Sequence, residues 1–477
     1  MQRVALAVII HKGKIIVEHL REEIRPSFRG VPAVLPGGKV LDGELPEVAL
    51  KREVKSDIGI DIEIVTCIAE RAHPLIPESR ISYFFCSVNT VNLTIGNKKK
   101  VKSAEWEDLP TAAVHMLTLF SRVFAFLVQQ LYGNVLPPNV KVPELMWLSQ
   151  DFERFGAKIR EGELVAFPTE TVYGLGAHAF DSFAVEKIFR AKNRPADNPL
   201  IVHVSSVEQL HEVAQTVPKL ATSLFMHFSP GPLTVLLPKN DNLPSVVTAH
   251  SSLVGVRIPA NLFALELLAA ARVPIAAPSA NKSGKPSATH HAHVINAFGS
   301  EVPHVVLGGP TTFGVESTVV LPKNEEQIVI MRQGAITKEE LKTTFPTHEV
   351  LIAGEDDTNL RSSPGTKYKH YAPNGKLTVL PLNSKKKWGA HLLKVINENP
   401  HESVCILCSK EVATLIPKEV NRIVLGSERN LSSIAASIFG ALLECDAKRY
   451  SLVFAQSFPR KGLGRTIMER LTRAAAN

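Results

Sequence analysis

The order of apolar and polar segments along the chain predicts three blocks of strands and helices. An apolar run at residues 4–10 is typical of a strand, which "HKGK" turns into a second strand, "IIVEHL". In the middle, strand-like segments such as "ELVAFPT", "NPLIVHV", "PLTVLLP" and "VGVRIP" have helical patterns between some of them. Toward the end, "KLTVLPL", "SVCILC", "NRIVLGS" and "SLVFAQS" alternate with helical segments. The pattern predicts an α/β and α+β multidomain protein with a small doubly wound parallel sheet last.

Two polar, turn-rich segments separate the blocks. The first is "GNVLPPNVKVP", rich in proline and glycine, and the second is "GEDDTNLRSSPGTKYKHYAPNGK". A chain of 477 residues is also too long for one ordinary core. We therefore expect an N-terminal domain at 1–134, a linker at 135–143, a middle domain at 144–350, an interdomain segment at 351–374 and a C-terminal domain at 375–477.

Composition narrows the class of protein. Apolar residues at 45% and charged residues at 21% are typical of a folded soluble chain, and the run at 4–10 is too short to span a bilayer. We therefore expect a cytoplasmic protein without a membrane anchor. Five cysteines without disulfide-scaffold spacing favour a reducing compartment. Cys405 and Cys408 form a Cys-x-x-Cys that is either a redox or metal pair or, as we favour, part of a buried strand.

The charge balance favours anionic ligands. A net charge of +8 suits nucleotides or RNA without identifying either. Two basic runs, "NKKKVK" at 97–102 and "SKKKW" at 384–388, are candidates for phosphate contacts. Such runs are more often solvated loops.

An acidic helix is predicted within "GGKVLDGELPEVALKREVKSDIGI" at residues 37–60. The framework positions are Gly38, Glu44, Arg52, Glu53, Gly59 and Ile60. Carboxylates at 53, 56 and 57 would share one helix face and converge on one Mg2+. The chain has Ser56 and Asp57 at the last two positions, so only Glu53 and Asp57 remain as metal ligands. Further ligands would be Glu44, Glu107 or Asp108.

This spacing resembles the Nudix box, the motif of pyrophosphohydrolases. The resemblance implies a Nudix-like α/β/α sandwich, closed by a helix near "AAVHMLTLFSRVFAFLVQQL". Because metal sites depend on charge and geometry, the altered acidic pair predicts impaired or absent hydrolysis. What this domain binds is left open.

Two segments of the middle block carry candidate binding groups. "FPTETVYGLGAHAF" at 167–180 has hydroxyls and small residues that let a polar ligand approach the backbone, although an ordinary strand-to-helix turn has the same pattern. In "AKNRPADNPLIVHV" at 191–204, Lys192 and Arg194 lie at the exposed end of a helix, where two cations can grip a triphosphate. His203 follows in a strand, as a ligand or a core histidine.

A third segment, "APSANKSGKPSATHHAHV" at 277–294, predicts a loop before a helix, where free backbone N–H groups and hydroxyls favour anions. Its polar residues are Ser279, Asn281, Ser283, Ser287 and Thr289. The histidines of "HHAH" do not converge on a helix, which argues against zinc. Downstream segments add Ser317, Thr318 and Arg332, and Thr337 with Glu340 predicts a capping box.

Taken in order, "FPTETVYGLG", "KNRPADNPLIVHV", "SPGPLTVLL", "VGVRIP", "PSANKSGKPS", "STVV" and "RQGAIT" resemble the YrdC-like domain of threonylcarbamoyl-AMP synthases. The segment "SPGTKYKHYAP" and the α/β block after it resemble the long, two-domain form of that family. The resemblance covers roughly residues 144–477. It implies a YrdC-like α/β twisted-sheet domain followed by a small Rossmann-like domain.

The resemblance also implies an activity and roles for residues. Members convert L-threonine, bicarbonate and ATP into threonylcarbamoyl-adenylate and pyrophosphate, and a partner complex passes the threonylcarbamoyl group to tRNA. N-carboxythreonine would attack the α-phosphate without a covalent enzyme intermediate, with Lys192, Arg194 and Mg2+ neutralising charge. Threonine contacts map onto Thr171, His203, Arg257, Ser279 and Ser317. ATP contacts map onto Lys192, Arg194, Asn198, Asn281, Thr289, Arg332, Tyr368 and Tyr371, the last two in a lid over the nucleotide.

Three alternatives stay open at this point. A carbamoyltransferase that matures hydrogenases shares the YrdC-like fold, but its paired Cys-x-x-Cys motifs are not visible here. A non-catalytic RNA-binding module, with weak RNA affinity, suits the basic chain. A nucleotide diphosphate hydrolase would make the Nudix-like domain the main catalyst. The sequence leaves oligomeric state, resting position of the lid and any monovalent ion undetermined.

Overall fold

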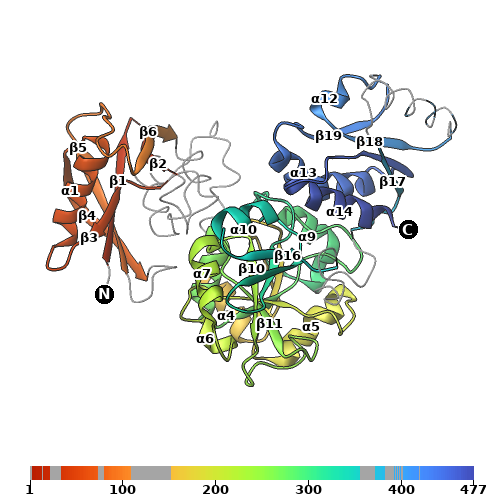
Figure 1. Cartoon of the computed structure of the whole chain (residues 1–477), viewed down its shortest axis with the longest axis horizontal. Helices are drawn as coiled ribbons and strands as arrows, with labels where there is room; N and C mark the ends of the chain where they lie inside the picture. Colours follow the sequence, from red (N-terminus) through yellow and green to blue (C-terminus); the bar gives the residue numbers. More distant parts are fainter. Residues whose placement is uncertain are drawn as a thin grey trace.

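The computed structural model describes residues 3–12, 14–21, 34–72, 80–108, 152–354, 371–381, 392, 394, 396, 398, 401–417 and 419–476 (Figure 1). The predicted linker at 135–143, the predicted closing helix at 112–131, the basic run at 384–388 and Tyr368 lie outside these residues. We call residues 3–108 the N-terminal part, 152–354 the middle part and 371–476 the C-terminal part. Among the described helices, none is both long and apolar enough to cross a bilayer.

The N-terminal part is built on a six-stranded mixed sheet with one described helix packed on it. Its elements are β1 (Arg3–His11), β2 (Lys14–Leu20), β3 (Gly37–Val40), α1 (Pro46–Ile58), β4 (Ile62–Ala72), β5 (Arg80–Val88) and β6 (Val101–Asp108). The strands run in the order β4-β5-β1-β2-β6, with β3 paired to β1. Leu50, Val54 and Ile58 of α1 pack in one core cluster with Ile9 of β1. The helix begins with Pro46 in its first turn and ends at Gly59 with φ of 77°.

The middle part is a ten-stranded mixed sheet with helices around it. Its helices are α4 (Phe152–Arg160), α5 (Ser182–Lys192), α6 (Leu210–Val213), α7 (Lys219–Phe228), α8 (Leu262–Ala271), α9 (His291–Phe298), η3 (Gly299–Glu301) and α10 (Lys338–Thr344). Its strands are β7 (Val165–Phe167), β8 (Gly174–His178), β9 (Ile201–His203), β10 (Leu233–Pro238), β11 (Leu253–Arg257), β12 (Ile275–Ala277), β13 (His304–Val305), β14 (Thr318–Pro322), β15 (Gln327–Arg332) and β16 (Glu349–Ile352), paired in the order β13-β7-β8-β12-β9-β11-β10-β14-β15-β16.

Local signals explain where several of these helices begin and end. Asp181 accepts hydrogen bonds from the first backbone N–H groups of α5, and Asn193 ends that helix with φ of 53°. The predicted capping box of Thr337 and Glu340 is confirmed at the start of α10. The end of α5 is therefore fixed at Lys192, directly before the loop that contains Arg194.

The C-terminal part has a four-stranded sheet in the order β17-β20-β18-β19, and all its pairings are parallel, as predicted. Its elements are β17 (Lys376–Leu380), β18 (Val404–Ser409), α12 (Lys410–Ala413), β19 (Arg422–Gly426), α13 (Leu431–Ala447), β20 (Leu452–Gln456) and α14 (Leu463–Ala475). Cys405 packs with α13 and α14, whereas Cys408 packs with α12 in a second cluster. The two cysteines therefore point to opposite faces of the sheet and do not form a redox or metal pair.

The middle and C-terminal parts share a hydrophobic cluster. Val172, Val315 and Ala335 of the middle part are buried in the same cluster as residues of α13 and α14. Gly314 has φ of 65°, and a Cβ there would lie 2.4 Å from the Cα of Ala436 on α13. The loop before β14 thus reaches the C-terminal part at a position where only glycine fits without a shift.

Candidate functional site

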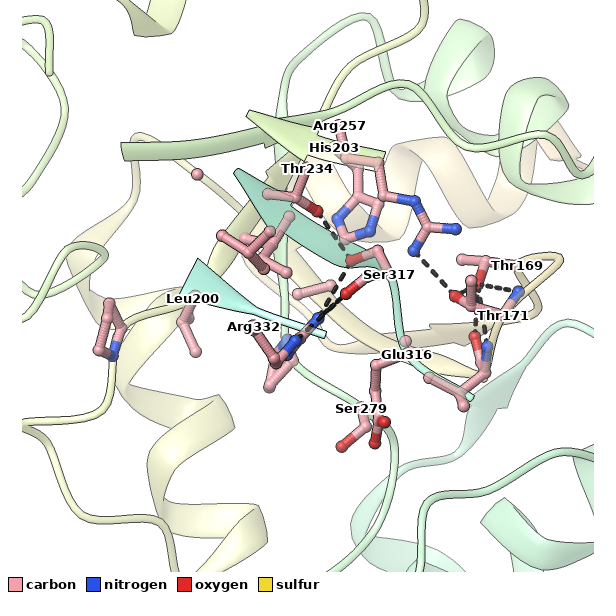
Figure 2. A pocket seen from close by; sticks show the side chains of 18 of the residues that line it. Thr169, Thr171, Leu200, His203, Thr234, Arg257, Ser279, Glu316, Ser317 and Arg332 are labelled. Atoms are coloured by element: carbon pink, nitrogen blue, oxygen red, sulfur yellow. Dashed lines mark hydrogen bonds between the residues drawn. The ribbon is translucent and has the colours of Figure 1, made fainter. Parts of the chain in front are cut away.

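A pocket of about 280 Å3 lies in the middle part, lined by strands β8, β9, β10, β11, β14 and β15 and by the loops after β7, α5 and β12 (Figure 2). Most of the residues predicted from the sequence to bind substrates line it. They are Thr171, Lys192, Arg194, His203, Arg257, Ser279, Asn281, Ser317, Arg332 and Tyr371. These residues come from segments up to 200 positions apart in the chain, and the sheet brings them to one cavity.

Three predicted nucleotide contacts are not placed in this lining. Asn198 is buried beside the pocket, and its backbone oxygen accepts a hydrogen bond from Nε of Arg194 at 3.1 Å. Thr289 lies behind the loop, where its backbone N–H donates to Nδ1 of His293 at 3.3 Å. Tyr368 lies outside the described residues. The backbone of Asn198 thus contacts Arg194, which lines the pocket.

One end of the pocket is organised by Arg257 at the end of β11. Its guanidinium donates to Oγ1 of Thr171 at 2.9 Å and to Oε1 of Glu170 at 2.6 Å, and Nε donates to the Gly231 oxygen at 3.2 Å. The other oxygen of Glu170 accepts the backbone N–H of Ala260 at 3.0 Å. The buried Arg257–Glu170 ion pair therefore fixes both the guanidinium and the Thr171 hydroxyl at this end.

His203 lies beside Arg257, because β9 and β11 pair in register at these two residues. Burial, with the neighbouring positive charge of Arg257, lowers the pKa of His203 to about 3. The imidazole is therefore neutral at physiological pH. Nδ1 of His203 is buried without a hydrogen-bond partner among the described residues.

The other end of the pocket is lined by three cations, the buried Lys192 and the half-buried Arg194 and Arg332. Arg194 is held by the backbone oxygens of Asn198 and Pro199, and Arg332 donates to the Ser317 oxygen at 2.8 Å and to its Oγ at 3.1 Å (Figure 2). Burial, with Arg332 next in effect, lowers the pKa of Arg194 to about 10. Burial also lowers the pKa of Arg332. The end is thus preorganised for an anion, which would relieve this crowding of positive charge.

Lys192 closes the same end from the last turn of α5. Its Nζ donates to the Ser279 oxygen at 2.5 Å and to the Asn281 oxygen, which ties α5 to the loop after β12. Burial lowers the pKa of Lys192 well below its usual value, with Arg194 adding to the effect. The side chain of Asn281 bonds within the loop, to the oxygens of Lys282 and Lys285 at 2.9 and 2.8 Å. Asn281 therefore shapes the loop around Lys192.

Three important residues of the site were missed from the sequence: Glu170, which holds Arg257, and Glu316 and Arg470. Glu316 lines the pocket next to Ser317 and accepts from Oγ of Ser287 at 2.7 Å. Its second oxygen accepts from Nε of Arg470, on α14, at 2.8 Å. The Arg470 guanidinium lies 5.4 Å from the ring centroid of Tyr371, which also stacks on Phe439 of α13 at 4.9 Å. The C-terminal part thus reaches the pocket wall through Arg470 and Tyr371.

The end of the predicted lid, from Tyr371 onward, rests on the loop after β12. The backbone N–H of Ala372 donates to the Gly284 oxygen at 2.9 Å, and Nζ of Lys285 contacts Oδ1 of Asn374. Tyr371 itself is buried, with φ of 66°, and burial raises its pKa above its usual value. The rest of the predicted lid, residues 355–370, lies outside the described residues.

The histidines at 290, 291 and 293 serve the start of α9. Nδ1 of His290 accepts the backbone N–H of Ala292 at 3.1 Å, and the ring centroids of His290 and His293 lie 6.0 Å apart. Within the described part of the chain, three metal-capable side chains come together only at His19, Glu105 and Glu107. His290 is therefore the N-cap of α9, whereas His291 and His293 lie within the helix.

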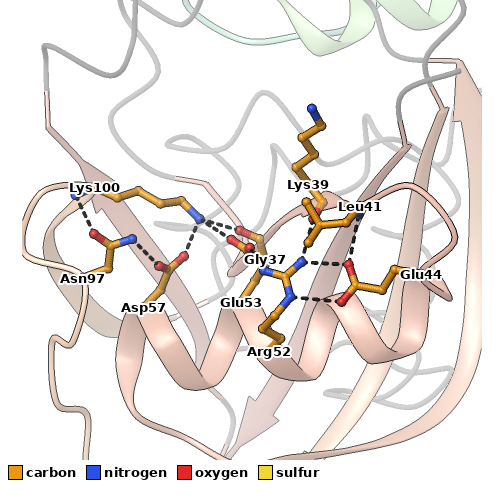
Figure 3. A network of polar contacts seen from close by, with 9 residues as sticks. All are labelled: Gly37, Lys39, Leu41, Glu44, Arg52, Glu53, Asp57, Asn97 and Lys100. Carbon is orange, nitrogen blue, oxygen red and sulfur yellow. Dashed lines mark hydrogen bonds and ion pairs between the residues drawn. The ribbon is translucent and has the colours of Figure 1, made fainter.

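In the N-terminal part, Glu53 and Asp57 lie on one face of α1, as the spacing predicts, and both contact Lys100 (Figure 3). Glu44 is bound by Arg52 at 2.8 Å. Glu107 does not join them. In the pairing of β2 with β6, Trp106 lies opposite Ile16, which packs toward α1, whereas Glu107 lies opposite Ile15. Because successive side chains of a strand alternate between faces, Glu107 points away from α1. The side chain of Asp108 is not described. The metal site at Glu53 and Asp57 stays a prediction.

Comparison with known proteins places these parts in families. A family model described as "Telomere recombination" matches residues 157–334, and the model of the C-terminal domain of threonylcarbamoyl-AMP synthase matches residues 336–476. A threonylcarbamoyl-AMP synthase of Bacillus subtilis is 40% identical over 320 residues, which cover 67% of this chain and 91% of the relative. The chain belongs to the threonylcarbamoyl-AMP synthase family. It is therefore an enzyme, as predicted.

Other relatives agree with this family. The threonylcarbamoyl-AMP synthase of Pyrococcus abyssi is 40% identical over 322 residues, covering 66% of this chain and 92% of the relative. A crystal structure of P. abyssi Sua5 in complex with L-threonine superposes with a TM-score of 0.62 at 38% identity, covering 68% of this chain and 94% of that one. A NUDIX domain model matches residues 1–126. The relatives support the synthase prediction and not the alternative of a nucleotide diphosphate hydrolase.

Proposed function

We propose that this chain is an L-threonylcarbamoyl-AMP synthase, which joins L-threonine, bicarbonate and ATP and releases pyrophosphate and water. The observation that carries the proposal is the pocket, with a neutral imidazole, a guanidinium and hydroxyls at one end and three clustered cations at the other. The similarity to P. abyssi Sua5, described with L-threonine, supports the same substrate here. The pocket suits one ligand that is an amino acid at one end and a nucleotide at the other.

We propose that Lys192, Arg194 and Arg332 bind the phosphates of ATP. Their pKa values are lowered because they are buried together, so an anion between them gains more than it would at an exposed lysine. Lys192 and Arg194 act as the catalytic cations, because charge on the α-phosphate oxygens grows during displacement. Asn281 supports Lys192 by holding the loop after β12, and Asn198 supports Arg194 through its backbone oxygen. Thr289 supports the same loop, since its backbone oxygen accepts from the N–H of Thr311.

We propose that threonine binds near Thr171, His203, Arg257, Ser279 and Ser317, the last two of which also contact Lys192 and Arg332. A guanidinium fixed by Glu170 is suited to the threonine carboxylate, because its planar fork can hold two carboxylate oxygens. The neutral imidazole and the hydroxyls are suited to the threonine side chain, since they donate and accept without adding charge. Selection for threonine would follow from satisfying these buried polar groups.

The chemistry proposed for the pocket needs no covalent enzyme intermediate. Threonine's amine and bicarbonate condense to N-carboxythreonine and release water. A carboxylate oxygen of that carbamate then forms a bond to the α-phosphorus, and the bond from this phosphorus to the oxygen bridging to the β-phosphate breaks, so that pyrophosphate leaves. The lining residues hold the two reactants in line and neutralise charge.

We infer that Mg2+ enters this pocket as a ligand of the ATP phosphates. Among the described residues that line the pocket, Glu316 is the one carboxylate, and its oxygens are engaged by Arg470 and Ser287. Mg2+ commonly keeps several waters and binds through substrate phosphates. The lining therefore does not fit a resident metal site, while it does fit a metal that arrives with its nucleotide.

We further propose the domain limits expected from the sequence and a place in tRNA modification. Residues 1–134, 144–350 and 375–477 would be the three domains, joined by segments at 135–143 and 351–374, with Tyr371 at the end of the lid. The product would pass to a complex that transfers the threonylcarbamoyl group to tRNA in the cytoplasm. Weak RNA binding by the basic chain would assist that meeting.

Pyrophosphate release measured with full-length protein tests the proposal. Release should require ATP, L-threonine and bicarbonate together, and Arg194→Ala should remove it. Arg190→Ala is the matched control, because Arg190 lies in α5 with a side chain that is 72% exposed. Release that continues without threonine, or equal rates in the two variants, would contradict the proposal.

A further inference from the structure

The Nudix-like box of the N-terminal part contains its own cation, Lys100. Nζ of Lys100 donates to the backbone oxygen of Gly37 at 2.9 Å, to Oε2 of Glu53 at 3.2 Å and to Oδ2 of Asp57 (Figure 3). Three oxygens from two different elements thus converge on the ammonium. These are the hard oxygen ligands that Mg2+ would use at this position.

The remaining oxygens of the box are also engaged by the protein. Oε1 of Glu53 accepts from Nη1 of Arg52, and Oδ1 of Asp57 accepts from Nδ2 of Asn97 at 3.2 Å. Oε1 of Glu44 accepts from Arg52 at 3.0 Å, and its Oε2 accepts the backbone N–H of Leu41 at 2.9 Å. All six carboxylate oxygens of the three acidic residues therefore have a partner within the chain, which leaves no ready set of ligands for a metal.

Lys100 comes from a turn that is fixed to α1. The backbone N–H of Gly96 donates to the Asp57 oxygen at 3.1 Å, and the N–H of Lys100 donates to the Asn97 oxygen at 3.0 Å. A Cβ on Gly96 would lie 2.2 Å from the Ser56 oxygen, so the turn lies close against the helix. Lys100 is followed directly by β6. The ammonium is therefore positioned by the fold, unlike Lys98 and Lys99, which are exposed.

Glu18 of β2 adds a third carboxyl group beside the same ammonium. It is fully buried, and both of its oxygens lack a hydrogen-bond partner among the described residues. Burial raises the pKa of Glu18 to about 8, although Lys100 acts in the opposite direction. Burial alone would lower the pKa of Lys100, but its hydrogen bond to Asp57 and the neighbouring carboxyl groups raise it.

A divalent ion does not fit this arrangement. To bind here, the ion would have to displace Lys100 from three oxygens and separate Arg52 from Glu53. At position 56, where the motif has a carboxylate, this chain has the exposed Ser56. Leaving the ammonium next to a divalent ion would add repulsion in a half-buried site. Mg2+ also demands near-ideal octahedral geometry.

We propose that the Lys100 ammonium is the resident cation of the Nudix-like box, and that this box consequently binds no divalent metal and does not hydrolyse diphosphates. The box face of α1, β3 and the turn at 96–100 is then held together by an internal ion-pair network. The N-terminal part keeps its fold without the metal-dependent chemistry, independently of the synthase pocket.

Binding of Mn2+ to the full-length protein without nucleotide tests this, measured from the electron paramagnetic resonance signal of free Mn2+. Mn2+ is the probe because it takes the same oxygen ligands as Mg2+. Wild type and Glu53→Gln should bind equal amounts. Lys100→Met should gain one Mn2+ per chain, and Lys100→Met with Glu53→Gln should lose it. Lys99→Met, at the exposed neighbour, should match wild type.

Two outcomes would overturn the inference. One is Mn2+ bound by wild type and lost in Glu53→Gln, which would show a working metal site. The other is a folded Lys100→Met protein, checked by circular dichroism, that gains no Mn2+. If Lys100→Met does not fold, the comparison of wild type with Glu53→Gln decides alone, because it needs only the native lysine.

Discussion

The buried side chain of Arg470 connects the C-terminal part to the pocket, and Arg470→Met should break that connection. Its side chain is 1% exposed, and it donates to Glu316 at 2.8 Å and to the Gln333 oxygen at 2.9 Å. Methionine keeps much of the side-chain volume and removes the charge. The Glu316 carboxylate would then stay buried without its closest cation.

The expected cost follows from that burial. Removing one partner of a buried ion pair typically costs about 3–5 kcal/mol, because the other charge is left uncompensated. At about 1.4 kcal/mol for each factor of ten, the opening equilibrium of this interface should rise by roughly two to three and a half powers of ten. Replacing Glu316 by Gln as well should recover part of the loss, since neither charge is then left unpaired.

Hydrogen exchange followed by mass spectrometry measures this opening directly. Peptides from β14, β15 and α14 should exchange faster in Arg470→Met by that factor. Arg473→Met is the matched control, because Arg473 lies one turn along α14 with a side chain that is 26% exposed. Exchange in Arg470→Met within about threefold of that control would refute the reasoning, because it would show that the pair does not hold the interface.

Four further results are expected. Burial raises the pKa of Glu316, but Arg470, Arg332 and its hydrogen bonds together outweigh burial and hold the pKa at about 2. The stabilising contribution of Glu316 is therefore complete above its ordinary pKa of 4.5 and is lost as pH falls from there to 2, so Glu316→Gln should flatten acid unfolding followed by circular dichroism, and an unchanged curve would count against this. Because burial lowers the pKa of His203 to about 3, the KM for threonine should show no titration of His203 between about pH 5.5 and 8. An inflection of KM near pH 6.5 that disappears in His203→Asn would contradict this prediction. Tyr371→Ala should lower product yield roughly tenfold, because it loses up to about 1.5 kcal/mol of stacking on Phe439, while calorimetry should show that threonine still binds. Tyr371→Phe should keep most of the yield, and equal losses in the two variants would exclude stacking as the cause. Lys192→Met should lower kcat for pyrophosphate release by about 10²–10³-fold, and a loss below about tenfold would argue against a catalytic cation.

The sequence predicted most of the pocket because its motifs follow the ends of strands. His203 ends β9, Ser317 directly precedes β14 and Thr171 lies in the loop between β7 and β8, and a sheet brings such ends together. The parallel C-terminal sheet was predictable for a similar reason, since strands and helices alternate strictly there. These predictions rest on local patterns, which a single sequence does contain.

The missed residues depend on contacts that no local pattern contains. Glu316 and Arg470 are 154 positions apart, and their pairing exists only once α14 packs against the middle part. Lys100 belongs to a basic run that is typical of a solvated loop, and the turn at Asn97 directs this one lysine into the box. The hydrogen bond from Arg194 to the backbone oxygen of Asn198 is likewise a contact that residue type does not predict.

The central claim is that this chain makes threonylcarbamoyl-adenylate, and mass spectrometry with labelled substrate tests it most directly. Full-length protein is incubated with ATP, L-threonine, 13C-bicarbonate and Mg2+. The account predicts a threonylcarbamoyl-adenylate made heavier by the single labelled carbon, formed only when all three substrates are present and together with pyrophosphate. ATP that is consumed without a labelled adenylate would contradict it.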